Sequence, residues 1–235
     1  RKMMRVKRLA VYIVLTLAFT ITLTPILLSF TSSFKTNDEV LDITPTLLPR
    51  QPTSEAWLGL FFERPKEASS TPSIYVAVPK HTFPRNLLNS TIVAGSTTII
   101  TTALALPAAY SIARFRFRGR ELVSTSTLLI YLLPHIVVLI PFYVIFFKMG
   151  LLDTYPPLIL TYLTVTVPLG IWFLRGYLLT MPWETEEAAM IDGCTRLAAL
   201  FRVILPQALP GVLAVAMYAF TYAWQEFLFA LVLTG

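Results

Sequence analysis

The sequence predicts an all-α protein that crosses a membrane several times. Of its 235 residues, 55% are hydrophobic and only 14% are charged, and the mean hydropathy is +0.67. Soluble domains carry about 25% charged residues, so most of this chain must be solvated by lipid. Apolar runs of about 20 residues, long enough to cross the hydrocarbon layer as a helix, recur along the sequence.

Five segments are long and apolar enough to be membrane spans. The first four contain no Asp, Glu, Lys or Arg, and the fifth contains one acid, Glu226. Prolines inside the spans predict bent helices, because each removes a backbone donor and crowds the preceding turn. The five predicted spans are 9–30, 91–113, 122–147, 158–174 and 209–233.

The first span has an alternative interpretation as a cleavable signal peptide. Basic residues precede it at positions 1, 2, 5, 7 and 8, as in the n-region of such a peptide. The apolar run is longer than a typical signal core, however, and no small-x-small cleavage site follows it. We therefore favour a retained membrane span.

The distribution of Lys and Arg predicts an N-terminus in the cytoplasm. Five basic residues precede the first span and four lie in the loop 114–121, whereas the loop around Lys148 and Asp153 holds one. Alternation of the spans then places 31–90 and 148–157 outside and 175–208 inside. We expect the Pro-rich segment 31–90 to pack as a small lid or helical hairpin on the outer surface.

The second span carries a face of small and hydroxyl side chains. Thr98, Thr101, Thr102 and Ala105 fall at helical spacing. Such faces favour close helix packing. A polar lining for a passage is the alternative.

A helix-glycine-helix hairpin is predicted in the cytoplasmic loop, over residues 182–206. Acidic residues at 184, 186 and 187 suit the positive end of a first helix, and Gly193 can take the left-handed conformation that ends it. Thr195 suits the cap of a second helix, which Leu205-Pro206 is expected to end. Residues 197, 200, 201 and 204 form its predicted apolar stripe, and Arg196 and Arg202 its wet side.

The motif in this hairpin resembles the EAA loop of the membrane subunits of ATP-binding-cassette (ABC) importers. That motif is Glu-Ala-Ala, three residues, Gly, nine residues and then Ile-x-Leu-Pro. This chain has Glu-Ala-Ala-Met-Ile-Asp-Gly at 187–193 and Val203-Ile204-Leu205-Pro206, with Val203 where Ile is usual. The resemblance implies ATPase coupling by Glu187, Ala188, Ala189, Asp192, Gly193, Leu205 and Pro206.

Other segments are similar to the carbohydrate-uptake, maltose-permease-like branch of that family. They are 33–36, 89–90, 109–115, 150–155 and 224–228, with Gln225 where Asn is common. The resemblance implies a type I importer permease, treated as one transmembrane domain over 1–235, with a sixth span expected beyond this portion and residues 64–82 as an insertion. It also implies a cell-membrane complex with a second permease subunit, an ATPase dimer, an extracytoplasmic solute-binding protein and a sugar-type solute.

Several activities are disfavoured by what the sequence contains. It has one cysteine and two widely separated histidines, so neither a disulfide framework nor a metal site is expected. It has no G-x-x-x-x-G-K-[ST] loop, so we expect ATP and magnesium to be bound by a partner ATPase, and no paired catalytic groups. Its basic residues occupy a few short segments, which disfavours nucleic-acid binding.

Candidate residues for a solute pathway lie near the end of the last predicted span. Glu226 falls about 25 Å along that helix from Leu209, where a charge must face a cavity or a partner. It could line the pathway or hydrogen-bond a neighbouring helix. Trp224 and Tyr222 could stack on sugar rings or belong to an interfacial aromatic belt. Gln225, between Trp224 and Glu226, is the fourth candidate.

Two other function classes remain open at this stage. An ion-coupled secondary transporter usually shows several charges within its spans and paired repeats, and this chain shows few of the former. A membrane scaffold subunit would leave the EAA-like hairpin without a purpose. The hairpin therefore favours the importer.

Overall fold

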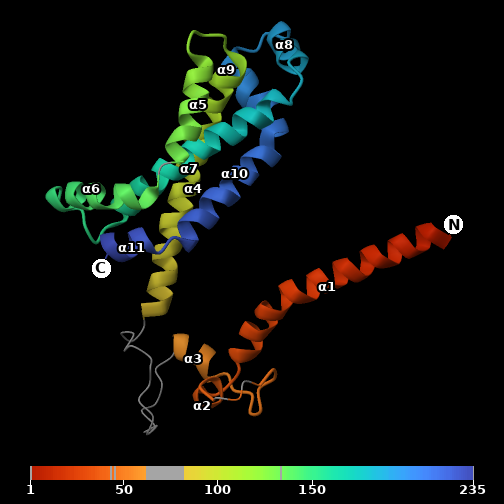
Figure 1. Ribbon diagram of the computed structural model, residues 1–235. Coiled ribbons are helices and arrows are strands. Elements are labelled where there is room, and N and C mark those ends of the chain that lie inside the picture. Colours follow the sequence, from red (N-terminus) through yellow and green to blue (C-terminus); the bar gives the residue numbers. More distant parts are fainter. Residues whose placement is uncertain (1, 43, 45, 62–81, 133, 235) are drawn as a thin grey trace. The chain divides into compact units, whose positions relative to one another are not determined.

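The computed structural model describes residues 2–42, 44, 46–61, 82–132 and 134–234. All regular secondary structure in these ranges is helical, which confirms the predicted all-α class (Figure 1). The chain forms two compact units, Arg1–Asn86 and Leu87–Gly235. Each is described by itself.

The first unit begins with a long apolar helix. α1 (Lys2–Ser32) is followed by the short helices α2 (Asn37–Val40) and α3 (Glu55–Phe61), and the unit ends in the first residues of α4 (Thr82–Arg114). Three threonine hydroxyls of α1, at positions 20, 22 and 24, donate to carbonyl oxygens four residues earlier. These bonds satisfy the polar groups of a helix whose surroundings are lipid. The predicted insertion 64–82 lies almost wholly outside the described residues.

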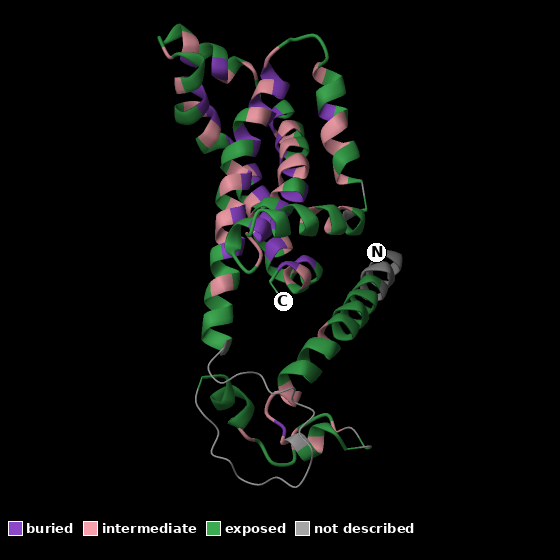
Figure 2. Ribbon diagram, turned by 90° about the vertical axis from the view of Figure 1, so that its left-hand side faces the viewer, coloured by how far each residue is buried: buried purple, intermediate pink, exposed green. Residues whose placement is uncertain are grey.

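The second unit is a bundle in which α7 packs against its neighbours α5, α10 and α4. Figure 2 shows that most of the buried residues belong to these helices. The helices after α4 are α5 (Arg120–Tyr131), α6 (His135–Lys148), α7 (Tyr155–Leu179), α8 (Glu184–Ile191), α9 (Arg196–Ala199), the π-helical turn η1 (Leu200–Ile204), α10 (Leu205–Gln225) and α11 (Leu228–Leu233).

Small residues let these helices approach closely. Ala105 and Thr101 of α4 are fully buried, and a Cβ on Gly170 of α7 would lie 3.3 Å from the Cβ of Ala105 and 3.0 Å from Val215 of α10. The hydroxyls of Thr101 and Thr166 are 2.7 Å apart in this interface. The packing interpretation of the hydroxyl face is therefore confirmed for Thr101 and Ala105.

Four helices are long and apolar enough to cross a membrane: Val11–Ser32, Phe83–Arg114, Tyr155–Leu179 and Arg196–Gln225. They correspond to the first, second, fourth and fifth predicted spans. The third predicted span, 122–147, is wrong as one continuous helix. Its two halves, α5 and α6, meet at a bend of 88° beside Pro134, which lacks a backbone donor and takes an extended conformation. The pair counts as a fifth span only if both halves share one crossing.

The last predicted span, 209–233, is also divided. α10 ends at Gln225, Glu226 is extended with φ −72° and ψ 126°, and α11 starts two residues later. At the other end, the prediction that Leu205-Pro206 ends a helix is wrong, because helix continues from Arg196 to Gln225. The wide π turn η1 ends at Ile204, two residues before Pro206, whose missing N–H interrupts the regular hydrogen bonds of this stretch.

Gly211 marks the tightest contact between α10 and α7. A Cβ at this position would lie 2.8 Å from two ring atoms of Tyr177, whereas a Cβ at Gly176 would meet nothing within 4 Å. Both substitutions raise helix propensity by about 1 kcal/mol. We therefore expect Gly211→Ala to be less stable than Gly176→Ala by about 1–3 kcal/mol, the usual cost of overpacking. Thermal unfolding of the two variants in detergent measures the difference, and equal midpoints would contradict the packing described.

Candidate functional site

The predicted hairpin is present, and its bend is built on Gly193. This residue has φ +89°, and a Cβ there would meet nothing within 4 Å, so backbone conformation rather than space requires glycine. The N–H of Cys194 donates to the carbonyl of Ala189 at 3.0 Å, and that of Gly193 donates to Met190 at 3.1 Å. This pair of bonds is a Schellman motif, which closes α8 and sets the direction of the chain after it.

The helix after the bend is capped as predicted. Thr195 is extended, with ψ 157°, and its hydroxyl accepts the N–H of Ala198 at 3.2 Å. α8 has the predicted acids Glu184, Glu186 and Glu187 in its first turn, at the positive end of its dipole. The local sequence therefore specifies both helices of the hairpin.

The predicted apolar stripe of the second helix is only half correct. Leu200 and Ile204 are buried, at 2% and 0% exposure, in a core with Leu174, Leu178 and Ala208. Leu197 and Phe201 are instead 66% and 53% exposed. The π turn η1 inserts a wider turn in the middle of the stripe, so positions spaced for a regular α-helix no longer share one face. Arg196 and Arg202 are exposed, as predicted.

One face of the hairpin is exposed. Glu187, Ala188, Ile191 and Asp192 lie on it, and Ile191 is 85% exposed. Ala189 was predicted on the same docking surface. It is only 8% exposed, because it lies with Glu186 on the buried side of α8. The indole of Trp183 donates to the carboxylate of Glu187 at 2.5 Å, which orients that side chain on the helix surface.

Glu186, predicted only as one of three acids in a first turn, is buried on the inner face of α8. Glu186 has no exposed side-chain surface, and its Oε2 lies 3.2 Å from Nε of Arg114, whose side chain is 5% exposed. The Tyr110 hydroxyl donates to the other carboxylate oxygen at 2.5 Å. Arg114 also donates to the carbonyl of Met181 at 3.3 Å. These contacts fasten the hairpin to the last turn of α4.

Aromatic rings close around this buried cluster. The guanidinium of Arg114 lies 5.4 Å from the ring centre of Trp183, and that of Arg196 lies 5.1 Å from the ring of Phe115. Phe115 in turn meets Tyr110 edge-on at 5.9 Å. Cations and ring faces attract each other, so the hairpin is held from both of its helices. The adjacent acids Glu186 and Glu187 were the available signal, but nothing in their spacing names a partner 76 residues earlier.

At the other end of α10, Glu226 occupies the break between two helices. Its carboxylate accepts the N–H groups of Leu228 at 2.8 Å and of Phe229 at 3.0 Å, both at the start of α11. It also accepts the hydroxyl of Tyr162 at 3.0 Å. Of the two roles left open, hydrogen bonding to a neighbouring helix is observed. The position within a continuous helix was wrong, because the carboxylate caps α11 instead.

The other three pathway candidates differ in their exposure. Tyr222 is partly buried and meets Tyr162 edge-on at 6.1 Å, next to Glu226. Trp224 is 44% exposed and stacks on Phe220 at 5.4 Å, and Gln225 is exposed. Among the described residues, no group of three or more metal-ligating side chains is close enough to hold an ion.

Glu186 supplies a test of the buried cluster. Glu186→Gln keeps the shape of the side chain but leaves Arg114 as an unpaired buried charge, so we expect a loss of about 3–5 kcal/mol of stability. Glu187→Gln, on the exposed face of the same helix turn, is the matched control and should change stability by less than about 0.5 kcal/mol. Thermal unfolding in detergent distinguishes them. If the two variants unfold alike, the pair does not fasten the hairpin.

The chain matches a known protein family and several of its members. The family model described as "Binding-protein-dependent transport system inner membrane component" matches residues 101–235. The inner membrane ABC transporter permease protein YcjP of Escherichia coli (strain K12) is 34% identical over 223 residues, which cover 95% of this chain and 74% of that protein. The trehalose transport system permease protein SugB of Mycobacterium tuberculosis (strain CDC 1551 / Oshkosh) is 35% identical over 91% of this chain and 71% of its own length.

A solved structure shares the fold. It is the crystal structure of a bacterial ABC transporter involved in the import of the acidic polysaccharide alginate. The TM-score is 0.76 at 20% sequence identity, covering 98% of this chain and 75% of the matched chain. This likeness confirms the predicted helical permease fold.

Proposed function

The chain belongs to the family of binding-protein-dependent transport system inner membrane components, and we propose that it forms half of the solute pathway of a sugar importer. It is a multi-pass inner-membrane permease subunit of an ABC importer, in a family without catalytic activity of its own, and ATP is bound by the partner ATPase. The trehalose named for SugB and the carbohydrate-branch sequence segments support a sugar or oligosaccharide as the solute.

The observation that carries the coupling part of the proposal is the exposed face of the hairpin in 182–206. Glu187, Ala188 and Asp192 present a carboxylate, a methyl group and a second carboxylate on one surface, beside the rigid bend at Gly193. Small side chains let a partner's groove close around the helix, and the carboxylates supply directional ion pairs. We assign this surface to the ATPase dimer, with Ala189 as its inner support.

Leu205 and Pro206 form the joint between the hairpin and the span. Helix continues through these two residues from Arg196 to Gln225. A displacement of α9 would therefore also displace α10. The π turn before Pro206 is the point where that helix can bend. This geometry supports the role of both residues in coupling.

The solute pathway is assigned to the end of α10, next to its break. Trp224 and Gln225 are exposed there, while Tyr222 and Glu226 hold the break against α7 through Tyr162. An aromatic face and an amide suit a sugar ring. In this arrangement a second permease subunit completes the pathway, and an extracytoplasmic binding protein delivers solute to the side that carries residues 31–90.

The coupling surface predicts two transport defects. Gly193→Asp places a side chain at φ +89°, and Glu187→Lys reverses the charge offered to the partner. Each variant should insert in the membrane and lose at least about tenfold in solute uptake and in ATPase stimulation by loaded binding protein, equivalent to about 1.4 kcal/mol of coupling. Glu184→Lys, outside the proposed surface, is the control. Wild-type uptake by both variants would remove the main support for this assignment.

Orientation predicts a labelling pattern. Cys194 should lie in the cytoplasm, since it is part of the hairpin, and a cysteine at Gln51 in a Cys194→Ser background should lie outside. A membrane-impermeant thiol reagent applied to intact cells should label the variant with a cysteine at position 51. It should not label Cys194 of the unaltered chain until the cells are lysed. Labelling of Cys194 alone in intact cells would reverse the orientation. Ser70, another suitable outer position by sequence, lies outside the described residues.

A further inference from the structure

We propose that α3 lies in the lipid headgroup region as an interfacial helix, clamped between the ends of two membrane spans. This inference concerns the first unit only and does not depend on the solute or on the coupling surface. The helix reads Glu-Ala-Trp-Leu-Gly-Leu-Phe, with a single charge at its start. Its large side chains are exposed: Trp57 46%, Leu58 52% and Phe61 51%.

The first clamp joins α3 to the end of α1. The indole N–H of Trp57 donates to the hydroxyl of Ser33 at 3.2 Å, one residue beyond the span Val11–Ser32. The ring of Trp57 also lies 6.3 Å from that of Phe34. Trp57 is therefore held at the depth where α1 leaves the hydrocarbon layer.

The second clamp joins α3 to the start of α4. The rings of Phe61 and Phe83 meet edge-on at 5.5 Å, and Phe83 is the first residue of the span Phe83–Arg114. Both clamps lie within the first unit. The end of one span and the start of the next lie on the same side of the membrane. The two contacts therefore hold both halves of α3 at that one interface.

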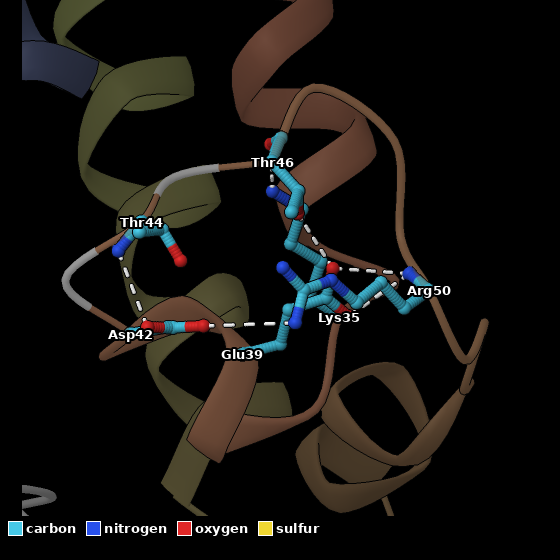
Figure 3. Close-up of polar contacts among 6 residues, drawn as sticks. All are labelled: Lys35, Glu39, Asp42, Thr44, Thr46 and Arg50. Carbon is cyan, nitrogen blue, oxygen red and sulfur yellow. Dashed lines mark hydrogen bonds and ion pairs between the residues drawn. The ribbon is translucent and has the colours of Figure 1, made fainter.

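A polar network brings the chain back to this position (Figure 3). Glu39 accepts the hydroxyl of Thr46 at 2.6 Å and the N–H of Arg50 at 3.0 Å, and the buried amine of Lys35 donates to the carbonyl of Thr46. The N–H of Thr53 then donates to the carbonyl of Phe34 at 2.8 Å. The loop before α3 is thus tied to the residues directly after α1.

The same network stays intact at neutral pH. The hydrogen bond from Thr46 lowers the pKa of Glu39 below its ordinary value. A lowered pKa means that the contact contributes its full stability above the unfolded pKa and loses it as the pH falls through the folded pKa. The hydrogen bonds of Glu39 are therefore present at physiological pH.

The composition of α3 identifies lipid as its partner. Trp prefers the headgroup level, where its apolar ring can be buried while its N–H stays wet, and Phe and Leu are typical of the apolar face of interfacial helices. A short helix lying in the interface buries its apolar face about 5–10 Å into the headgroup and acyl boundary. Neither α3 nor the neighbouring span Val11–Ser32 has a buried residue, so the apolar side chains of both are available to lipid.

Spin-label accessibility tests this placement. A nitroxide is attached at Leu58→Cys in a Cys194→Ser background, and the permease is reconstituted in phospholipid vesicles without binding protein. The ratio of collisions with oxygen, which partitions into lipid, to collisions with a water-soluble nickel chelate is then measured. Labels at Leu17, on the exposed side of α1, and at Gln51, in the polar loop, are the references.

The expected ratio at position 58 is several-fold above that at position 51 and within about twofold of that at position 17. A ratio equal to that at position 51 would show α3 in water and overturn the proposal. Low accessibility to both reagents would show α3 covered by protein and overturn it as well. Since the measurement needs no transport, its failure would leave the importer assignment untouched.

Discussion

The hairpin depends on one buried ion pair, Arg114 with Glu186. A pair with 5% and 0% side-chain exposure gains little net stability over an apolar contact of the same size, because both charges lose their hydration. Its effect is on geometry. The carboxylate reaches the guanidinium and the Tyr110 hydroxyl only when α8 sits at one distance and rotation against α4. The exposed face opposite Glu186 is therefore presented in a defined direction, which a purely apolar contact could not specify as narrowly.

Lipid imposes the second constraint, since backbone groups within a membrane must find partners inside the protein. The interruptions of the second unit meet it in different ways. At Glu226 a side-chain carboxylate replaces the carbonyl oxygens that a continuing helix would offer to Leu228 and Phe229. At Pro206 the missing donor coincides with a π turn, which redistributes the hydrogen bonds without ending the helix. Breaks in helices are thus placed where the chain itself supplies the compensation.

Sequence reasoning succeeds here where information is local. Apolar length predicts four of the spans, and glycine chemistry predicts the positive φ of Gly193 and the cap at Thr195. It fails where tertiary partners decide. An acid in an apolar run is predicted to lie within a continuous helix and to face a cavity or a partner. In the structure, Glu226 instead ends α10 and caps α11. Glu186 looks like one of three acids in a first turn, and only the fold shows that Arg114 lies opposite it.

The packing of α4, α7 and α10 decides how a movement of the hairpin can travel. Fully buried alanines, Gly170 and the Thr101–Thr166 hydrogen bond leave no space for the helices to slide independently. The hairpin is paired with α4 through Arg114 and continues into α10 through η1. It is therefore connected to two of these three helices. Under the proposed function, a displacement of α8 would move the group as a body rather than one helix alone. Bending is then expected at the ends of this group, at the π turn before Pro206 and at the Glu226 break, because the regular helical hydrogen bonds are interrupted at these two places.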